Sequence, residues 1–194
     1  MCFRLGRKCD PDLCRTCGAH EVLDPVRRRE TDVTRGRCAN TQIQRNIPKR
    51  TLLGHSGVAG FGLYAGERIR KNEYIGEYKG EILSKDEADR RGSIYHYRST
   101  NYLFKLNTGV CTTPRVTTRL LMKRPEQDVD STLGGNKTRF INHSSDSKNI
   151  NCGPHLLLCN TVTRLGMYAT TNIEVGEELF FDYRLLRRSA NREM

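Results

Sequence analysis

Two short stretches of this chain carry its strongest signal, Arg139-Phe-Ile-Asn-His-Ser144 and Gly176-Glu-Glu-Leu-Phe-Phe-Asp-Tyr183. Each stretch mixes hydrogen-bonding side chains with bulky apolar ones. Because buried polar groups need hydrogen-bond partners, this mixture is typical of a polar site set in an aromatic wall. Two simpler interpretations stay open: Asn142 and His143 as a satisfied core pair, and the second stretch as a core strand that ends in a helix cap at Asp182.

Length and composition suit one domain with a small appendage. The chain has 194 residues, of which 36% are hydrophobic, and a mean hydropathy of −0.65. No apolar run approaches the ~20 residues that span a bilayer. The N-terminal stretch Met1–Lys8 carries charges where a signal peptide needs an apolar run. We therefore expect neither secretion nor a membrane partner.

Positive charge is concentrated at the front of the chain. The net charge is +11, and residues 1–50 hold twelve Lys and Arg against six Asp and Glu. The remaining residues hold twenty-one against sixteen, so the front is several times more basic per residue. A dense positive field favours polyanions, which predicts contact with DNA, RNA or chromatin. The alternative is a solvated basic face with no dedicated partner.

Cysteines divide the chain in the same place, because five of the eight lie in the first fifth. This front segment has few apolar residues, so a metal or a cross-link must hold it together. In an intracellular protein a metal is the better explanation, and thiolates at this spacing suit tetrahedral zinc. The predicted ligands are Cys2, Cys9, Cys14, Cys17 and Cys38. Five ligands exceed one tetrahedral site, and reduced, unliganded cysteine is the alternative.

From about Thr51 onward the pattern predicts a mainly β fold with short helices. Short strands are expected at 61–65, 73–83, 102–106, 155–159, 164–169 and 178–181. One helix is expected to begin at the capping box Ser84-Lys-Asp-Glu87 and to end at Gly92. The Thr-rich stretch 108–125 has neither strand nor helix periodicity, and we interpret it as an inserted loop.

Two further features could carry chemistry. The glycines of Gly60-Phe61-Gly62 would let a backbone come close to a ligand, although a tight turn explains the same pattern. Tyr78 lies in a predicted strand, where a structural tyrosine is the simplest interpretation. Neither feature decides the function alone.

Taken together and in order, these motifs resemble those of SET-domain protein lysine methyltransferases. The similarity covers residues 52–184 and is closest to the enhancer-of-zeste family, the catalytic subunits of Polycomb repressive complex 2. Further stretches carry that closer similarity: Cys9-Asp-Pro-Asp-Leu-Cys14, Asp86-Glu-Ala-Asp-Arg-Arg-Gly92 and Gly135-Asn-Lys137. The resemblance implies small twisted β-sheets around a pseudoknot, preceded by a zinc-bound cysteine-rich segment.

It also implies a domain organisation. Residues 1–46 would be part of a cysteine-rich CXC segment, and Met1 would lie inside that segment rather than at its start. Thr41 stands where many relatives have a further cysteine. Residues 50–185 would form the SET domain, with 108–125 inserted, and 186–194 a basic tail.

Site roles follow from the same resemblance. Tyr183 and Tyr78 would be catalytic, in a substrate-lysine channel with Phe104, Ile141 and Phe181. S-adenosyl-L-methionine would bind at a second group of residues: Gly60, Phe61, Gly62, Asn142, His143 and Tyr183. Phenylalanine at position 181, where some relatives have tyrosine, implies di- and trimethylation.

The implied activity is methyl transfer to a histone lysine, most specifically lysine 27 of histone H3, in Polycomb-type silencing. Implied partners are the histone H3 tail or nucleosome and the other subunits of Polycomb repressive complex 2, in the nucleus. The alternative is a catalytically inert module that binds chromatin or nucleic acid through the basic front segment.

Overall fold

The computed structural model describes residues 8–27, 30, 33, 38–98, 101–106, 127–159 and 162–183. Three predictions lie outside these residues, namely Cys2 as a ligand, the insertion 108–125 and the tail 186–194. Within the described part, no helix is both long and apolar enough to cross a membrane.

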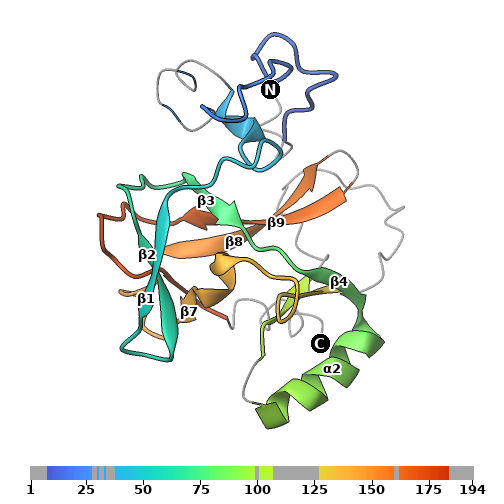
Figure 1. Cartoon of the computed structure of the whole chain (residues 1–194), viewed down its shortest axis with the longest axis vertical. Coiled ribbons are helices and arrows are strands. Elements are labelled where there is room, and N and C mark those ends of the chain that lie inside the picture. The colour runs from blue at the N-terminus through green and yellow to red at the C-terminus, as the bar shows by residue number, and fades with distance from the viewer. Residues whose placement is uncertain are drawn as a thin grey trace, which may run out of the picture.

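The described elements form a mainly β fold, as predicted (Figure 1). The strands are β1 (Thr51–His55), β2 (Phe61–Ala65), β3 (Tyr74–Glu77), β4 (Glu81–Ser84), β5 (Leu103–Leu106), β6 (Gln127–Asp130), β7 (Asn142–His143), β8 (Cys152–Cys159), β9 (Val162–Ala169) and β10 (Phe180–Phe181). The helices are α2 (Lys85–Arg98) and two 3-10 turns, η2 (Ala39–Thr41) and η3 (Lys137–Phe140). They build four small sheets in the described residues, with the orders β1-β2, β3-β9-β8, β4-β6-β5 and β7-β10.

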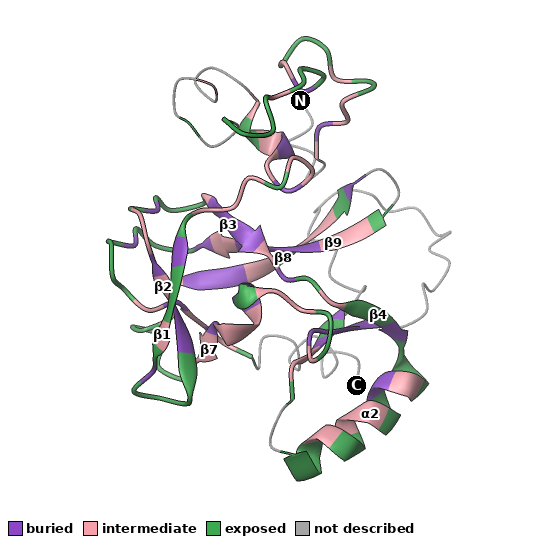
Figure 2. Ribbon diagram, in the orientation of Figure 1, coloured by how far each residue is buried: buried purple, intermediate pink, exposed green. Residues whose placement is uncertain are grey.

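The core lies between these sheets rather than on one face of a single sheet. Figure 2 shows burial concentrated on the β3-β9-β8 sheet and its neighbours, whereas α2 is largely exposed. Several of the largest core side chains are completely covered: Leu63, Ile69, Met167, Ile173 and Leu179. Small sheets must share one core to bury enough apolar surface, and this sharing fixes how the loops between them meet.

The single strand predicted for residues 73–83 is two strands in different sheets. β3 pairs with β9, whereas β4 pairs with β6. The chain changes sheets at Tyr78–Gly80, and a Cβ on Gly80 would lie 2.4 Å from the Asp130 carbonyl oxygen. Only glycine allows that approach, and the crossing leaves Tyr78 buried at 7% exposure.

Helix α2 begins as predicted but does not end at Gly92. The Glu87 amide lies 3.4 Å from the Ser84 hydroxyl, which accepts its hydrogen bond, as the capping box predicts. The helix continues to Arg98 because contacts beyond Gly92 hold it to the sheet. Tyr95 donates its hydroxyl to the Asp130 carboxylate at 2.8 Å, so a tertiary bond outweighs the cost of one internal glycine.

The cysteine-rich segment stands at one end of the molecule, before β1 (Figure 1). Its described residues contain no strand, and polar bonds shape it. Arg45 donates to the carbonyls of Gly18, Ala19 and Glu21 at 2.9 to 3.0 Å. A small apolar cluster of Ile43, Tyr74 and Cys159 joins this segment to the β3-β9-β8 sheet.

Candidate active site

The segments 139–144 and 176–183 pair with each other in space. β7 and β10 run parallel, with Asn142 opposite Phe180 and His143 opposite Phe181. The Ser144 amide also donates to the Phe181 carbonyl at 3.3 Å. This crossing brings Asn142, His143 and Tyr183 together, as the predicted pseudoknot requires.

Four of the five residues predicted to form the lysine channel make one series of neighbouring aromatic rings, and Ile141 lies beside it. Ring centroids are 5.1 Å apart for Tyr78 and Phe104, 6.0 Å for Phe104 and Phe181, and 4.5 Å for Phe181 and Tyr183. Ile141 is 1% exposed, and its carbonyl faces Tyr183. Tyr183 itself is 43% exposed, so the series runs from the core to the surface.

Both tyrosine hydroxyls donate their hydrogens to backbone carbonyls. Tyr183 donates to the Ile141 carbonyl at 2.6 Å, and Tyr78 donates to the Tyr102 carbonyl at 3.0 Å. The Tyr183 oxygen therefore keeps its lone pairs for an incoming donor, whereas the Tyr78 oxygen has Ser131 as a neighbouring hydrogen-bonding side chain and keeps one lone pair beyond that contact. Desolvation raises the pKa of Tyr183, and it raises the pKa of Tyr78 to about 12, so both stay neutral at physiological pH. Tyr102 accepts this hydrogen bond through its backbone carbonyl, so its residue type could not have indicated the contact from the sequence.

The glycine loop lies beside Asn142, and its two glycines have different structural reasons. Gly60 has φ +49°, and a Cβ there would meet no atom within 4 Å. Gly62 has no positive φ, but a Cβ there would lie 2.1 Å from a carboxylate oxygen of Glu178. Gly60 thus sets a left-handed turn with open space beside it, whereas Gly62 makes room for a neighbour.

Asn142 ties this loop to the paired strands. Its Nδ2 lies 3.0 Å from Glu178 Oε1, 3.2 Å from the Phe61 carbonyl and 3.4 Å from the Ala59 carbonyl. Sequence reasoning missed Glu178, because nothing in the order of residues places position 178 beside position 62.

His143 supports Tyr183 from behind. The Tyr183 amide donates to His143 Nδ1 at 3.1 Å, and the two rings lie 5.1 Å apart. An amide always carries its hydrogen, so Nδ1 is the acceptor and the neutral ring is protonated at Nε2. The Phe181 carbonyl, 3.3 Å from the same nitrogen, is then a contact without a shared hydrogen.

These residues fit a methionine-containing cosubstrate. The loop at Gly60 is open, half of Phe61 is exposed, and Asn142 Oδ1 has no partner among the described residues. The loop at Gly60 leaves space for a ligand, and the amide oxygen of Asn142 can accept a hydrogen bond from an ammonium or hydroxyl group on that ligand.

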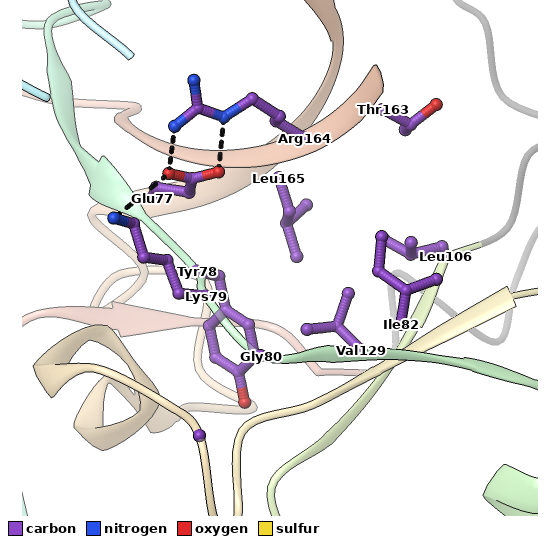
Figure 3. A pocket seen from close by; sticks show the side chains of 11 residues that line it. Glu77, Tyr78, Lys79, Gly80, Ile82, Leu106, Val129, Thr163, Arg164 and Leu165 are labelled. Atoms are coloured by element: carbon purple, nitrogen blue, oxygen red, sulfur yellow. Dashed lines mark hydrogen bonds and ion pairs between the residues drawn. The ribbon is translucent and has the colours of Figure 1, made fainter. Parts of the chain in front are cut away.

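A cavity of about 330 Å³ includes Tyr78 in its lining (Figure 3). Its apolar lining comes from Ile82, Leu106, Val129 and Leu165, and the Tyr78 hydroxyl points away from that lining. At its edge, Arg164 forms a two-pronged ion pair with Glu77 at 2.6 and 2.5 Å. None of the other predicted site residues lines this cavity.

Three of the predicted zinc ligands meet in the cysteine-rich segment. The sulfur atoms of Cys9, Cys17 and Cys38 all lie within 4.8 Å of one another. Three convergent thiols are a donor set that suits zinc. Cys14 is not in this group, although its carbonyl accepts a weak bond from Cys17 Sγ at 3.6 Å.

The fold and this site define a SET domain. A family model described as the SET domain matches residues 60–184, and the chain therefore belongs to the SET-domain family. Its curated relatives are of the enhancer-of-zeste kind, as the sequence motifs predicted. It is 37% identical to the histone-lysine N-methyltransferases EZA1 of Arabidopsis thaliana and EZ2 of Zea mays, over 187 residues in each case. These alignments cover 94% of this chain but 19% and 18% of the relatives, so the chain spans about a fifth of their length.

Solved structures of Polycomb Repressive Complex 2 from Chaetomium thermophilum (ctPRC2) share the fold. One is ctPRC2 in an autoinhibited conformation bound to S-adenosylmethionine, with 33% identity and a TM-score of 0.75 over 97% of this chain and 23% of that chain. Another is ctPRC2 in complex with H3K27me3, with 35% identity and a TM-score of 0.74 over 94% of this chain and 20% of that chain.

Proposed function

We propose that this chain is the catalytic portion of a histone lysine methyltransferase, with S-adenosyl-L-methionine as the methyl donor and lysine 27 of histone H3 as the target. The observation that carries the proposal is the aromatic channel with two neutral tyrosine hydroxyls, each anchored to a backbone carbonyl. Similarity to named histone-lysine methyltransferases and to a complex bound to S-adenosylmethionine supports the same activity.

The channel addresses the main energetic obstacle. Lysine titrates near ~10.4, so presenting a neutral amine at pH 7 costs roughly 4–5 kcal/mol. Phe104, Phe181 and Ile141 are 1 to 3% exposed, and such an apolar wall disfavours the ammonium. The amine that enters can donate a hydrogen to the Tyr78 oxygen, at the lone pair that the Ser131 contact leaves.

The reaction is a displacement at carbon in which positioning supplies much of the rate. S-adenosyl-L-methionine, when bound, supplies a methyl group activated on a sulfonium. The amine nitrogen forms the new N–C bond as the C–S bond breaks, and the extra proton leaves to water. The Tyr183 hydroxyl oxygen and the Ile141 carbonyl present partial negative charge that steers the methyl group. Gly60, Asn142 and His143 form the side on which the cosubstrate would lie.

The front segment has a structural and a binding role in this proposal. Cys9, Cys17 and Cys38 would hold zinc, with Cys14 and Cys2 as further ligands. The basic residues of 1–46 would contact DNA or RNA, and 50–185 would be the catalytic domain. Partners are the nucleosome and the subunits of Polycomb repressive complex 2, which places the protein in the nucleus.

The test is transfer of label from S-adenosyl-L-methionine to nucleosomes, with and without the partner subunits. We expect label on histone H3 that disappears when lysine 27 of the histone is replaced by alanine. Tyr183→Phe is the matched control, because it keeps the ring and removes only the hydroxyl. Absence of label from a folded, fully assembled protein would replace the proposal with an inert chromatin-binding module.

A further inference from the structure

Glu178 occupies an unusual place beside the candidate cosubstrate site. Its carboxylate fills the space that a side chain at position 62 would need, since a Cβ there would lie 2.1 Å from Oε1. The same Oε1 accepts from Asn142 Nδ2 at 3.0 Å. The other oxygen lies 3.2 Å from the Tyr64 hydroxyl, which is closer, at 2.6 Å, to the His55 carbonyl. The firm partner of Glu178 is therefore Asn142.

This contact determines which way the Asn142 amide faces. All three groups near Nδ2 are acceptors that carry no hydrogen, namely the Glu178 carboxylate and the carbonyls of Phe61 and Ala59. A flipped amide would place its oxygen against three oxygens, so only one orientation is allowed. Glu178 contributes the charged and shortest of these bonds, and charged bonds are the stronger ones.

We infer that Glu178 is a positioning residue that holds Asn142 Oδ1 toward the cosubstrate, so that it accepts from a donor group such as the ammonium of the methionine portion. The inference rests on the proposed function. It gives a reason for the glycine at position 62, whose backbone is ordinary, because a Cβ there would displace the Glu178 carboxylate from Asn142. The backbone of Glu178 is held separately, by Asn151 Nδ2 at 2.8 Å, so the side chain can be changed without releasing the strand.

A matched pair of variants tests the role of the acceptor. Glu178→Met keeps the length of the side chain and removes both acceptors, whereas Glu178→Gln keeps one oxygen for Asn142. Binding of S-adenosyl-L-methionine is measured by calorimetry on the full chain assembled with its complex subunits, and kcat and KM are measured beside it. We expect Glu178→Met to weaken binding and to raise the KM for S-adenosyl-L-methionine roughly tenfold or more, as for loss of one charged hydrogen bond. Glu178→Gln should stay within about threefold of wild type, and the KM for nucleosomes should not change.

Two further variants separate positioning from general stability. Asn142→Ala combined with Glu178→Met should bind no more weakly than Asn142→Ala alone, because the second change acts only through the first residue. Tyr64→Phe, which removes the other neighbour of Glu178, should leave the KM within about twofold.

The outcomes distinguish this inference from the proposed function. Unchanged binding in Glu178→Met, equal losses in the Met and Gln variants, or additive losses in the double variant would each overturn the role of Glu178. If the wild-type complex neither binds S-adenosyl-L-methionine nor transfers label, the proposed function fails instead.

Discussion

The glycine loop gives the sharpest quantitative prediction, because alanine at Gly60 and alanine at Gly62 should destabilise the fold for different reasons. In Gly62→Ala the new Cβ would lie 2.1 Å from Glu178 Oε1 and 3.1 Å from Ser56 Cβ, so the Glu178 side chain must move. Moving it loses the charged bond to Asn142, worth about 1.5–3 kcal/mol, whereas the clash itself adds little because it involves the far end of a flexible side chain. We therefore predict that the free energy of unfolding falls by about 1.5–3 kcal/mol.

Gly60→Ala meets no atom, but it must adopt φ +49°. A left-handed alanine costs about 1–2 kcal/mol. In a chain of this size, 1 kcal/mol lowers the melting temperature by roughly 2–4 °C, so thermal unfolding resolves both changes.

The deciding measurement repeats both substitutions in a Glu178→Ala background. Removing the carboxylate removes the clash at Gly62 and leaves the backbone strain at Gly60 unchanged. The cost of Gly62→Ala should therefore shrink by at least about 1 kcal/mol in that background, whereas the cost of Gly60→Ala should stay the same. If both costs are independent of Glu178, the steric argument for Gly62 is wrong.

Three further predictions follow from the same structure. Phe181→Tyr adds a hydroxyl to a side chain that is 3% exposed in the proposed lysine channel, so products should shift from trimethyl- to monomethyl-lysine in mass spectra; an unchanged product distribution would remove Phe181 as the determinant. Ion pairs with Arg90 and Arg91 lower the pKa of Glu87 to about 2 from its usual 4.5, and the pKa of Asp130 is also lowered, by hydrogen bonds that outweigh desolvation. Because these pKa values are lower in the folded state than in the unfolded state, the stabilisation from the ionised carboxylates is complete above about pH 4.5 and is lost as the pH falls toward 2. Arg91→Met should therefore flatten the dependence of the free energy of unfolding on pH in this range. A pH dependence with the wild-type slope would contradict the role of these ion pairs. Removing zinc with a chelator should lower the melting temperature of the wild type but have little further effect on Cys38→Ser; elemental analysis that finds no zinc in the wild type would refute the site.

The sequence alone determined the residue types that the chemistry needs and the order in which they occur. A tyrosine hydroxyl, an Asn-His pair and paired glycines are chemical requirements that a linear pattern can display, and the mainly β alternation was equally readable. The cysteines of the front segment were identified in the same way, because a segment poor in apolar residues needs another source of stability.

Only the tertiary structure decided how these residues act on one another. The strand predicted at 73–83 divides into two because Gly80 must pass the Asp130 carbonyl, and helix α2 passes Gly92 because Tyr95 bonds to Asp130. Both outcomes depend on β6, a short strand that was not predicted from the sequence.

The same holds for Glu178, whose contacts with Asn142 and with the space beside Gly62 join residues far apart in the chain. A local pattern records what a side chain can do, whereas its partner is set by the packing of several small sheets around one core. The family and the residues of the candidate site could therefore be predicted from the motifs, but the contacts that orient those residues exist only once the sheets have met.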